Sequence, residues 1–222
     1  MKKQDHISVS VGRNAVKTTA STFGVYAGLL GIEHGFFETL QGNVAPKSLR
    51  IMAVGSFELP FPFGHEPAMT LIPNFLVTGI AAIIAGLAII IWSMAWVDKK
   101  HGAEVLLLLS VLLLLVGGGF GPISPLLVAC IAARGIDKPV IWWRRLLPSG
   151  LRRVLALLWR WFLVGSILYV PCELVLGQVL HLQNDHRQVL TNLNLMLTYP
   201  MLALFVLTLF AAFARKIDRS EG

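Results

Sequence analysis

The chain has 222 residues and a net charge of +7, and although 55% of the residues are hydrophobic only 14% are charged. This composition lies outside the range of soluble globular proteins, and the length excludes several large domains. Since nothing resembles a nucleic-acid-binding module, the positive charge indicates contact with anionic lipid and no nucleic acid partner.

Apolar runs of about 20 residues predict helices that can span a bilayer. They indicate an all-α, multi-pass protein of the cell membrane, a helical bundle with 1–222 as a single membrane domain. Four runs predict spanning helices and a fifth stretch is broken. The helices are expected at about 18–40, 74–97, 104–118, 122–134, 154–176 and 195–214, with outer loops at 41–73 and 177–194 and a basic cytoplasmic segment at 134–153. Cys130 and Cys172 lie in apolar runs, which favours buried apolar packing over a disulfide.

Residues 1–17 are polar and basic, which predicts a solvated cytoplasmic lead. The apolar run after them continues beyond Glu33 and His34 without a cleavage pattern, so we interpret it as a helix and not as a signal peptide. Small residues recur on one side of this helix, at Gly24, Gly28, Gly31 and Gly35. Such a face lets two helices approach closely, and packing within the chain is favoured over homodimerisation.

The stretch 104–135 contains a break, and whether this stretch crosses the membrane or turns back determines the side of the membrane on which the later segments lie. As one helix it would be about 45 Å long, against a hydrocarbon core of ~30 Å. Glycine and proline disfavour helix in its middle, which predicts a hairpin that returns to its own side. The residues of the break are Gly117, Gly118, Gly119, Gly121, Pro122 and Pro125. Whether the hairpin crosses fully or is re-entrant stays open, and a tight turn is favoured over a pore or gate.

The segment 134–153 is the most basic part of the chain and contains Trp142 and Trp143. Its mixture of cations and apolar residues is typical of a segment that lies on an anionic membrane surface. The cations expected to face lipid are Arg144, Arg145, Arg152 and Arg153. If the hairpin returns to the cytoplasmic side and both termini are cytoplasmic, fifteen of the nineteen Lys and Arg residues are cytoplasmic, which agrees with the positive-inside bias.

Histidines and carboxylates gather on the predicted outer side, where imidazole and carboxylate could bind zinc or relay protons. The favoured alternative is that His34 and Glu38 simply pair and cap the helix, while the loop histidines are solvated. The candidate ligands are Glu33, His34, Glu38, His65, Glu66, Glu173, His181, Asp185 and His186. No cofactor and no catalytic residue can be named from the sequence.

Several short motifs occur in the first 125 residues: 31–35 (GIEHG), 40–43 (LQGN), 66–70 (EPAMT), 72–74 (IPN) and 117–122 (GGGFGP). In these motifs the chain resembles a family of uncharacterised prokaryotic multi-pass membrane proteins. The resemblance implies a membrane protein and carries no established activity.

Three functions remain open on the sequence. A structural or accessory membrane subunit, acting with a partner membrane subunit or as a homo-oligomer, requires the fewest assumptions. A small transporter or channel would use the broken hairpin. A membrane-embedded metal-binding protein or enzyme would use the outer histidines and carboxylates. Because no HExxH, GxSxG or Walker sequence is present, an enzyme is the less favoured interpretation.

Overall fold

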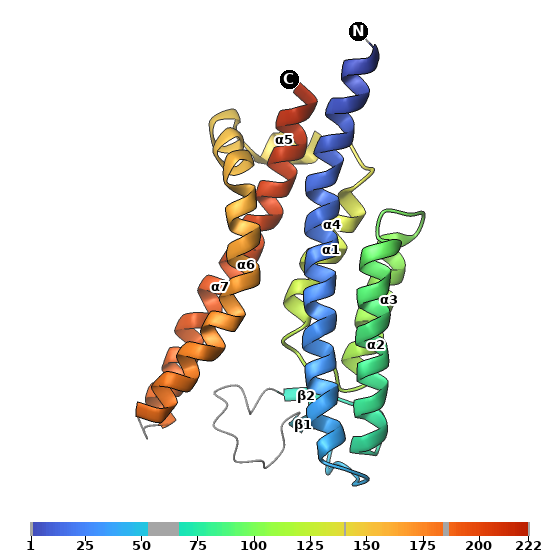
Figure 1. The fold of residues 1–222 in the computed structure, drawn as a ribbon, viewed down its shortest axis with the longest axis vertical. Coiled ribbons are helices and arrows are strands. Elements are labelled where there is room, and N and C mark those ends of the chain that lie inside the picture. Colours follow the sequence, from blue (N-terminus) through green and yellow to red (C-terminus); the bar gives the residue numbers. More distant parts are fainter. Residues whose placement is uncertain (1, 53–66, 140, 184–186, 222) are drawn as a thin grey trace.

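A computed structural model describes residues 2–52, 67–139, 141–183 and 187–221. Within these ranges the side chains of some residues, including 2–14 and 176–197, are not described. The regular secondary structure of the described chain is helical apart from two short strands, as Figure 1 shows. The helices are α1 (Lys2–Leu40), α2 (Phe75–Ala95), α3 (Gly102–Leu115), α4 (Ile123–Gly135), α5 (Ile141–Leu146), α6 (Ser149–Gln183) and α7 (Arg187–Glu221).

The central element is α1, which packs against α2, α4 and α7. It has 39 residues and is therefore about 58 Å long, and it begins at Lys2 instead of near residue 18. The predicted helix start is thus wrong, because the helix continues through residues 2–17, whereas the solvation of residues 2–14 stays a prediction. Ala15 and Val16 are buried, and Lys17 makes an ion pair with Asp98.

Two helices among the described residues are long and apolar enough to cross a membrane, Phe75–Ala95 and Thr198–Asp218. By length and composition alone this is weak support for a membrane protein. The first of them, α2, is preceded by the capping residue Asn74, whose side chain accepts a hydrogen bond from the Val77 amide at 3.1 Å. Such a cap satisfies one of the free amides at a helix start. The apolar helices α3 and α4 are shorter, with 14 and 13 residues.

The pair formed by α6 and α7 is longer than the sequence predicts. Each helix has 35 residues, and Pro171 and Pro200 lie inside them without ending them. Residues 177–183 and 187–194, expected in an outer loop, are helical, so this loop prediction is wrong. The physical reason is that polarity alone does not stop a helix, and no glycine or proline occurs between Gly177 and Pro200. Figure 1 shows α6 and α7 leaning away from α1 at the end remote from the termini.

Two three-residue strands, β1 (Arg50–Met52) and β2 (Pro67–Met69), form an antiparallel pair that the sequence did not predict. In this pair Ile51 lies opposite Ala68, and both are buried. An additional bridge joins Thr70 to Val116, so the strands are attached to the segment between α3 and α4. The loop 41–73 is therefore partly ordered by strand pairing, although 53–66 lies outside the described residues.

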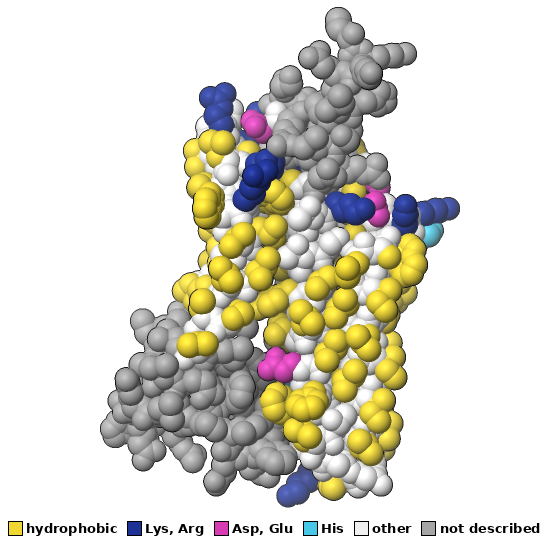
Figure 2. Space-filling view, viewed as in Figure 1, with side chains coloured by type: hydrophobic (Ala, Val, Ile, Leu, Met, Phe, Trp, Pro, Cys, Tyr) yellow, Lys and Arg dark blue, Asp and Glu magenta, His cyan; other side chains and the backbone are white. Residues whose placement is uncertain are grey.

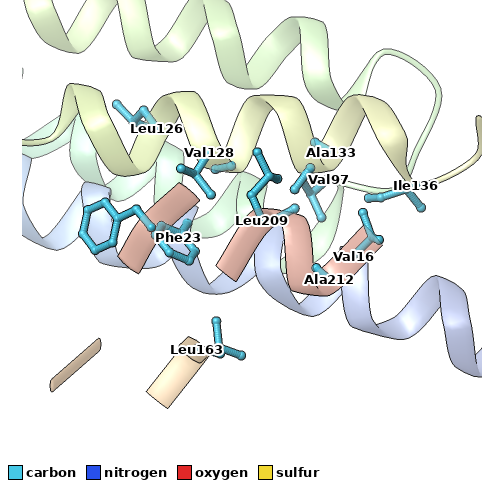
Figure 3. Packing of buried hydrophobic residues seen from close by; sticks show 14 of the residues in the cluster. Val16, Phe23, Val97, Leu126, Val128, Ala133, Ile136, Leu163, Leu209 and Ala212 are labelled. Atoms are coloured by element: carbon cyan, nitrogen blue, oxygen red, sulfur yellow. The ribbon is translucent and has the colours of Figure 1, made fainter. Parts of the chain in front are cut away.

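Apolar side chains of α1, α2, α3, α4, α6 and α7 form the core, part of which is drawn in Figure 3. Phe23 of α1 meets Phe205 of α7 edge to face, with ring centroids 5.0 Å apart. Leu126 and Val128 of α4 and Leu209 of α7 belong to the same cluster. In this arrangement α4 packs against α1.

Both chain termini and α5 lie at one end of the molecule, while β1 and β2 lie at the other (Figure 1). Figure 2 shows hydrophobic side chains over the middle of one face and basic side chains gathered mostly toward the end that holds the termini. The termini and the predicted basic segment thus share one end.

Candidate functional site

The glycines of α1 lie where it meets α2 and α3. A Cβ atom at Gly28 would lie 2.7 Å from the Gly86 carbonyl oxygen, and one at Gly35 would lie 2.6 Å from the Gly79 carbonyl oxygen. One at Gly24 would meet the Ser93 side chain. Because real Cβ atoms are not found this close to backbone atoms, the contact between α1 and α2 depends on glycine on both helices.

The fourth glycine of this face, Gly31, contacts α3 and not α2. A Cβ atom there would lie 2.7 Å from a methyl carbon of Leu113. The glycine face is therefore shared between two neighbours within the chain, and Leu113 is almost completely buried in this contact.

The break between α3 and α4 covers residues 116–122, because α3 ends at Leu115 and α4 begins at Ile123. Gly117 and Gly119 have φ angles of +94° and +82°, a conformation that residues with a Cβ atom rarely adopt. Pro122 precedes the first residue of α4, and Pro125 is buried in its first turn, where a proline needs no amide partner.

Main-chain hydrogen bonds hold this break against β2 and its neighbours. The Gly117 amide donates to the Met69 carbonyl at 2.9 Å, and the Phe120 amide donates to the Pro67 carbonyl at 3.2 Å. The Leu71 amide donates to the Leu115 carbonyl at 2.9 Å. The non-helical backbone is thus hydrogen-bonded to other parts of the chain.

Two buried threonines complete the attachment of the break. The Thr78 hydroxyl of α2 donates to the Val116 carbonyl at 2.7 Å and lies 2.5 Å from the Thr70 hydroxyl. Both side chains are buried. The sequence did not predict this contact, because Thr78 is a single hydroxyl in an apolar helix and Thr70 belongs to a short motif to which no role is attached. Only their spatial pairing gives them a role.

His34 and Glu38 of α1 lie against the break. His34 is 6% exposed and Glu38 is fully buried. A Cβ atom at Gly117 would strike the Glu38 carboxylate, and one at Gly119 would strike the His34 imidazole. The spacing of four residues predicts that His34 and Glu38 share one side of the helix. Both side chains are covered by Gly117 and Gly119, the glycines of the break that have positive φ.

Further from the break, Glu33 is half-buried, and no group of three His, Cys, Asp or Glu residues that could hold a metal ion occurs among the described residues. His65, Glu66, Asp185 and His186 lie outside the described residues, as do the side chains of Glu173 and His181. The metal site therefore stays a prediction.

Basic side chains surround the ends of α4, α5, α6 and α7. Arg144, Arg145 and Arg153 are exposed, and Arg152 is partly buried. Sequence reasoning missed the role of the cations of α7. The Lys216 ammonium donates to the carbonyls of Gly135, Ile136 and Lys138, and so caps the C-terminal end of α4.

The guanidinium of Arg215 in the same turn donates to the Ala156 carbonyl at 3.0 Å and lies over the Trp159 ring.

The cysteines make no disulfide: Cys130 is half-buried on α4, and Cys172 is exposed on α6, contrary to the predicted burial.

No family model, no curated protein and no solved structure matches this chain, so the resemblance seen in the short motifs adds no fold and no activity to what the residues themselves support.

Proposed function

We propose that this chain is a multi-pass integral membrane protein with a structural or accessory role. The observation that supports this proposal is the apolar outer surface of the bundle. Exposed Leu, Ile, Val, Met and Trp side chains occur on all the longer helices, such as Ile84 (61% exposed) on α2, Leu108 (69%) on α3 and Leu157 (70%) on α6. Such a surface would be costly in water and is favourable in lipid.

In this proposal α1, α2, α6 and α7 cross the bilayer, and the α3–α4 hairpin enters it and returns. The arms of the hairpin are about 20 Å long, shorter than a hydrocarbon core of ~30 Å, which supports a re-entrant hairpin. Both termini and 134–153 are cytoplasmic, with Arg144, Arg145 and Arg153 against anionic lipid.

The structural role is supported by how the interior is built. Close glycine contacts, the Lys17–Asp98 ion pair and the Lys216 cap fix the helices to one another. The apolar outer faces of α2 and α6 are surfaces on which a partner membrane subunit or a second copy could pack. Chemistry at a catalytic centre is not needed to explain these features.

Reconstitution of the purified chain into sealed vesicles tests the proposal. A structural or accessory subunit is expected to give no flux of protons, sodium, potassium or chloride above that of protein-free vesicles. A vesicle preparation that contains an unrelated helical membrane protein at equal density serves as the control for leakage. Ion-selective flux through the chain alone would overturn the structural role.

The second candidate is a small transporter. One observation favours it: the broken α3–α4 hairpin lies against the buried His34 and Glu38 side chains. Broken helices next to ionisable residues recur in transporters. The flux measurement separates the two candidates, and loss of flux in Glu38→Gln would assign it to this place.

A further inference from the structure

The carboxyl group of Glu38 stands out among the buried polar groups of the described chain. The residue is fully buried, and neither Oε1 nor Oε2 has a hydrogen-bond partner. No lysine or arginine among the described residues makes an ion pair with it. A buried, ionised carboxylate without a donor or a counter-charge costs several kcal/mol, so a carboxyl group in this place is far more stable when it is neutral.

The residues that the structure describes around Glu38 offer no compensating charge. On its own helix Glu33 is the nearest titratable neighbour apart from His34, and it is acidic. α2 has no charged residue. The charged residues of α3 and α4 are Glu104 and Arg134, and they form an ion pair in which Oε1 of Glu104 lies 3.6 Å from Nη1 of Arg134. On α4 the Cys130 thiol lies 4.0 Å from Ser110, and Arg50 of β1 is exposed. The described charges of α7 lie in its last turns, around Lys216, which bonds the end of α4.

The two buried hydroxyls that attach the break are engaged with other groups. The Thr78 hydroxyl donates to the Val116 carbonyl, and the Thr70 hydroxyl contacts Thr78 and the Ile72 main chain. These groups stabilise the break and not the carboxyl group that lies beneath it.

The cover of the site consists of backbone. Gly117 lies directly on the Glu38 carboxyl group, and Gly119 lies directly on the His34 ring. Both glycines have positive φ, and both are buried. Water can therefore reach Glu38 through this cover only if the backbone at 117–119 moves, which breaks the Gly117–Met69 and Phe120–Pro67 hydrogen bonds.

His34 supplies a basic nitrogen on the same side. Its Nδ1 atom lies 3.0 Å from the Leu30 carbonyl, and since a carbonyl only accepts, we assign the proton of the neutral ring to Nδ1. Nε2, the nitrogen beside Gly119, is then the one that can accept a proton.

We propose that His34 and Glu38 form a proton-binding site that the α3–α4 break closes. At neutral pH the proton resides on the Glu38 carboxyl group while Gly117 and Gly119 cover it. When the break moves away from the site, the O–H bond of the Glu38 carboxyl group breaks. The proton passes to water or to Nε2 of His34 and leaves a solvated carboxylate. The site couples one protonation step to the position of the break. This inference goes beyond the structural role, since a proton can bind and leave from one side without any flux.

Infrared spectroscopy of the purified chain in detergent tests the occupancy of the site. At neutral pH we expect a carbonyl band of a protonated carboxyl group, which Glu38→Gln abolishes. Glu33→Gln, on the same helix, is the matched control and should leave the band unchanged. Isotope-labelled glutamate in the wild-type chain must shift the band, which provides a test even if Glu38→Gln fails to fold. Absence of the band, or its persistence in Glu38→Gln, overturns the proposal.

Hydrogen–deuterium exchange of residues 116–122 tests the coupling. As the pH rises, exchange of these amides in the wild-type chain is expected to increase beyond that in Glu38→Gln, because only the wild type gains a charge that needs solvent. Gly150→Ala, where a Cβ atom has no neighbour within 4 Å, should behave as the wild type. If the ratio of the exchange rates of these amides in the wild type and in Glu38→Gln does not change with pH, the coupling is overturned.

A metal cation is the competing occupant. When sodium, potassium or zinc is added at neutral pH, the melting temperatures of the wild type and of Glu38→Gln should change by the same amount. Stabilisation of the wild type alone would assign the site to that cation and overturn the proton assignment.

Discussion

Lys17 and Asp98 illustrate how single residues fix this bundle. They are 81 positions apart, yet the Lys17 ammonium donates to the Asp98 carboxylate at 2.8 Å, joining α1 to the turn after α2. The Asp98 side chain is 15% exposed and that of Lys17 37% exposed, so solvent screens the pair. The hydrogen bond from Lys17 is the main reason why the pKa of Asp98 lies below its ordinary value of 3.8.

We predict a defined pH dependence for this pair. A carboxyl group with a lowered pKa in the folded state stabilises the fold above its ordinary pKa, and that stability is lost as the pH falls through the lowered value. Asp98→Asn should therefore reduce the free energy of unfolding by about 0.5–1 kcal/mol at neutral pH, with a difference that vanishes in acid. Thermal unfolding in detergent measures it. Asp218→Asn, at an exposed position, should show no such trend.

Trp159 provides a second test at the scale of one residue. It is 8% exposed, and its indole nitrogen donates to the Thr19 hydroxyl at 3.0 Å, joining α6 to α1. Trp159→Phe should cost about 1–3 kcal/mol, because a buried hydrogen bond and some packing are lost. Trp161→Phe is the control, since Trp161 is 73% exposed. Equal unfolding temperatures for the two variants would contradict the role of this contact.

At the scale of elements, the contact between α1 and α2 depends on paired glycines. Gly28 meets the Gly86 backbone, and Gly35 meets the Gly79 backbone. Because backbone atoms cannot rotate away as a side chain can, an added methyl group must separate the helices.

Gly28→Ala is thus expected to destabilise the chain by about 1–3 kcal/mol through overpacking. The control is Gly165→Ala in α6, where the nearest atom to an added Cβ is 3.5 Å away, an ordinary contact. There the removal of backbone freedom should stabilise the helix by about 0.5–1 kcal/mol. Denaturation in detergent compares the two, and a destabilisation of equal size at both positions would argue against the close α1–α2 contact.

At the scale of the whole molecule, the arrangement of the helices carries a prediction about sidedness. The chain from 134 to 153 shares one end with both termini, and the residues that connect α1 to β1 lie at the other end (Figure 1). If the bundle spans a bilayer, these two groups of residues face opposite compartments.

Single cysteines at Ser149 and Ala45, in a chain without Cys130 and Cys172, test this arrangement. Both positions are exposed, so a membrane-impermeant thiol reagent can reach them. In intact cells Ala45→Cys should react and Ser149→Cys should react only after permeabilisation. Labelling of both from one side would contradict the re-entrant hairpin and the proposed topology together.

Local chemistry determined much of this protein. The hydrophobic runs predict the helices, and Asn74 is a suitable cap residue for the start of α2. The break after α3 follows from clustered glycine and proline. Each of these signals acts within a few residues. The helical continuation of 177–183 and 187–194 does not follow from the hydrophobic pattern, because a loss of hydrophobicity by itself does not end a helix. The strand pair was missed because three-residue strands are stable only through their partner and through Val116.

Contacts between distant parts of the chain were decided by the tertiary structure alone. The spacing of His34 and Glu38 placed them on one side of a helix, but only the packing of α1 against the break put Gly117 and Gly119 on top of them. The same holds for Lys17 with Asp98 and for Thr70 with Thr78. Sequence periodicity states which face of a helix is apolar or small, whereas the identity of the neighbour depends on how all the faces fit together, and that is a property of the whole bundle.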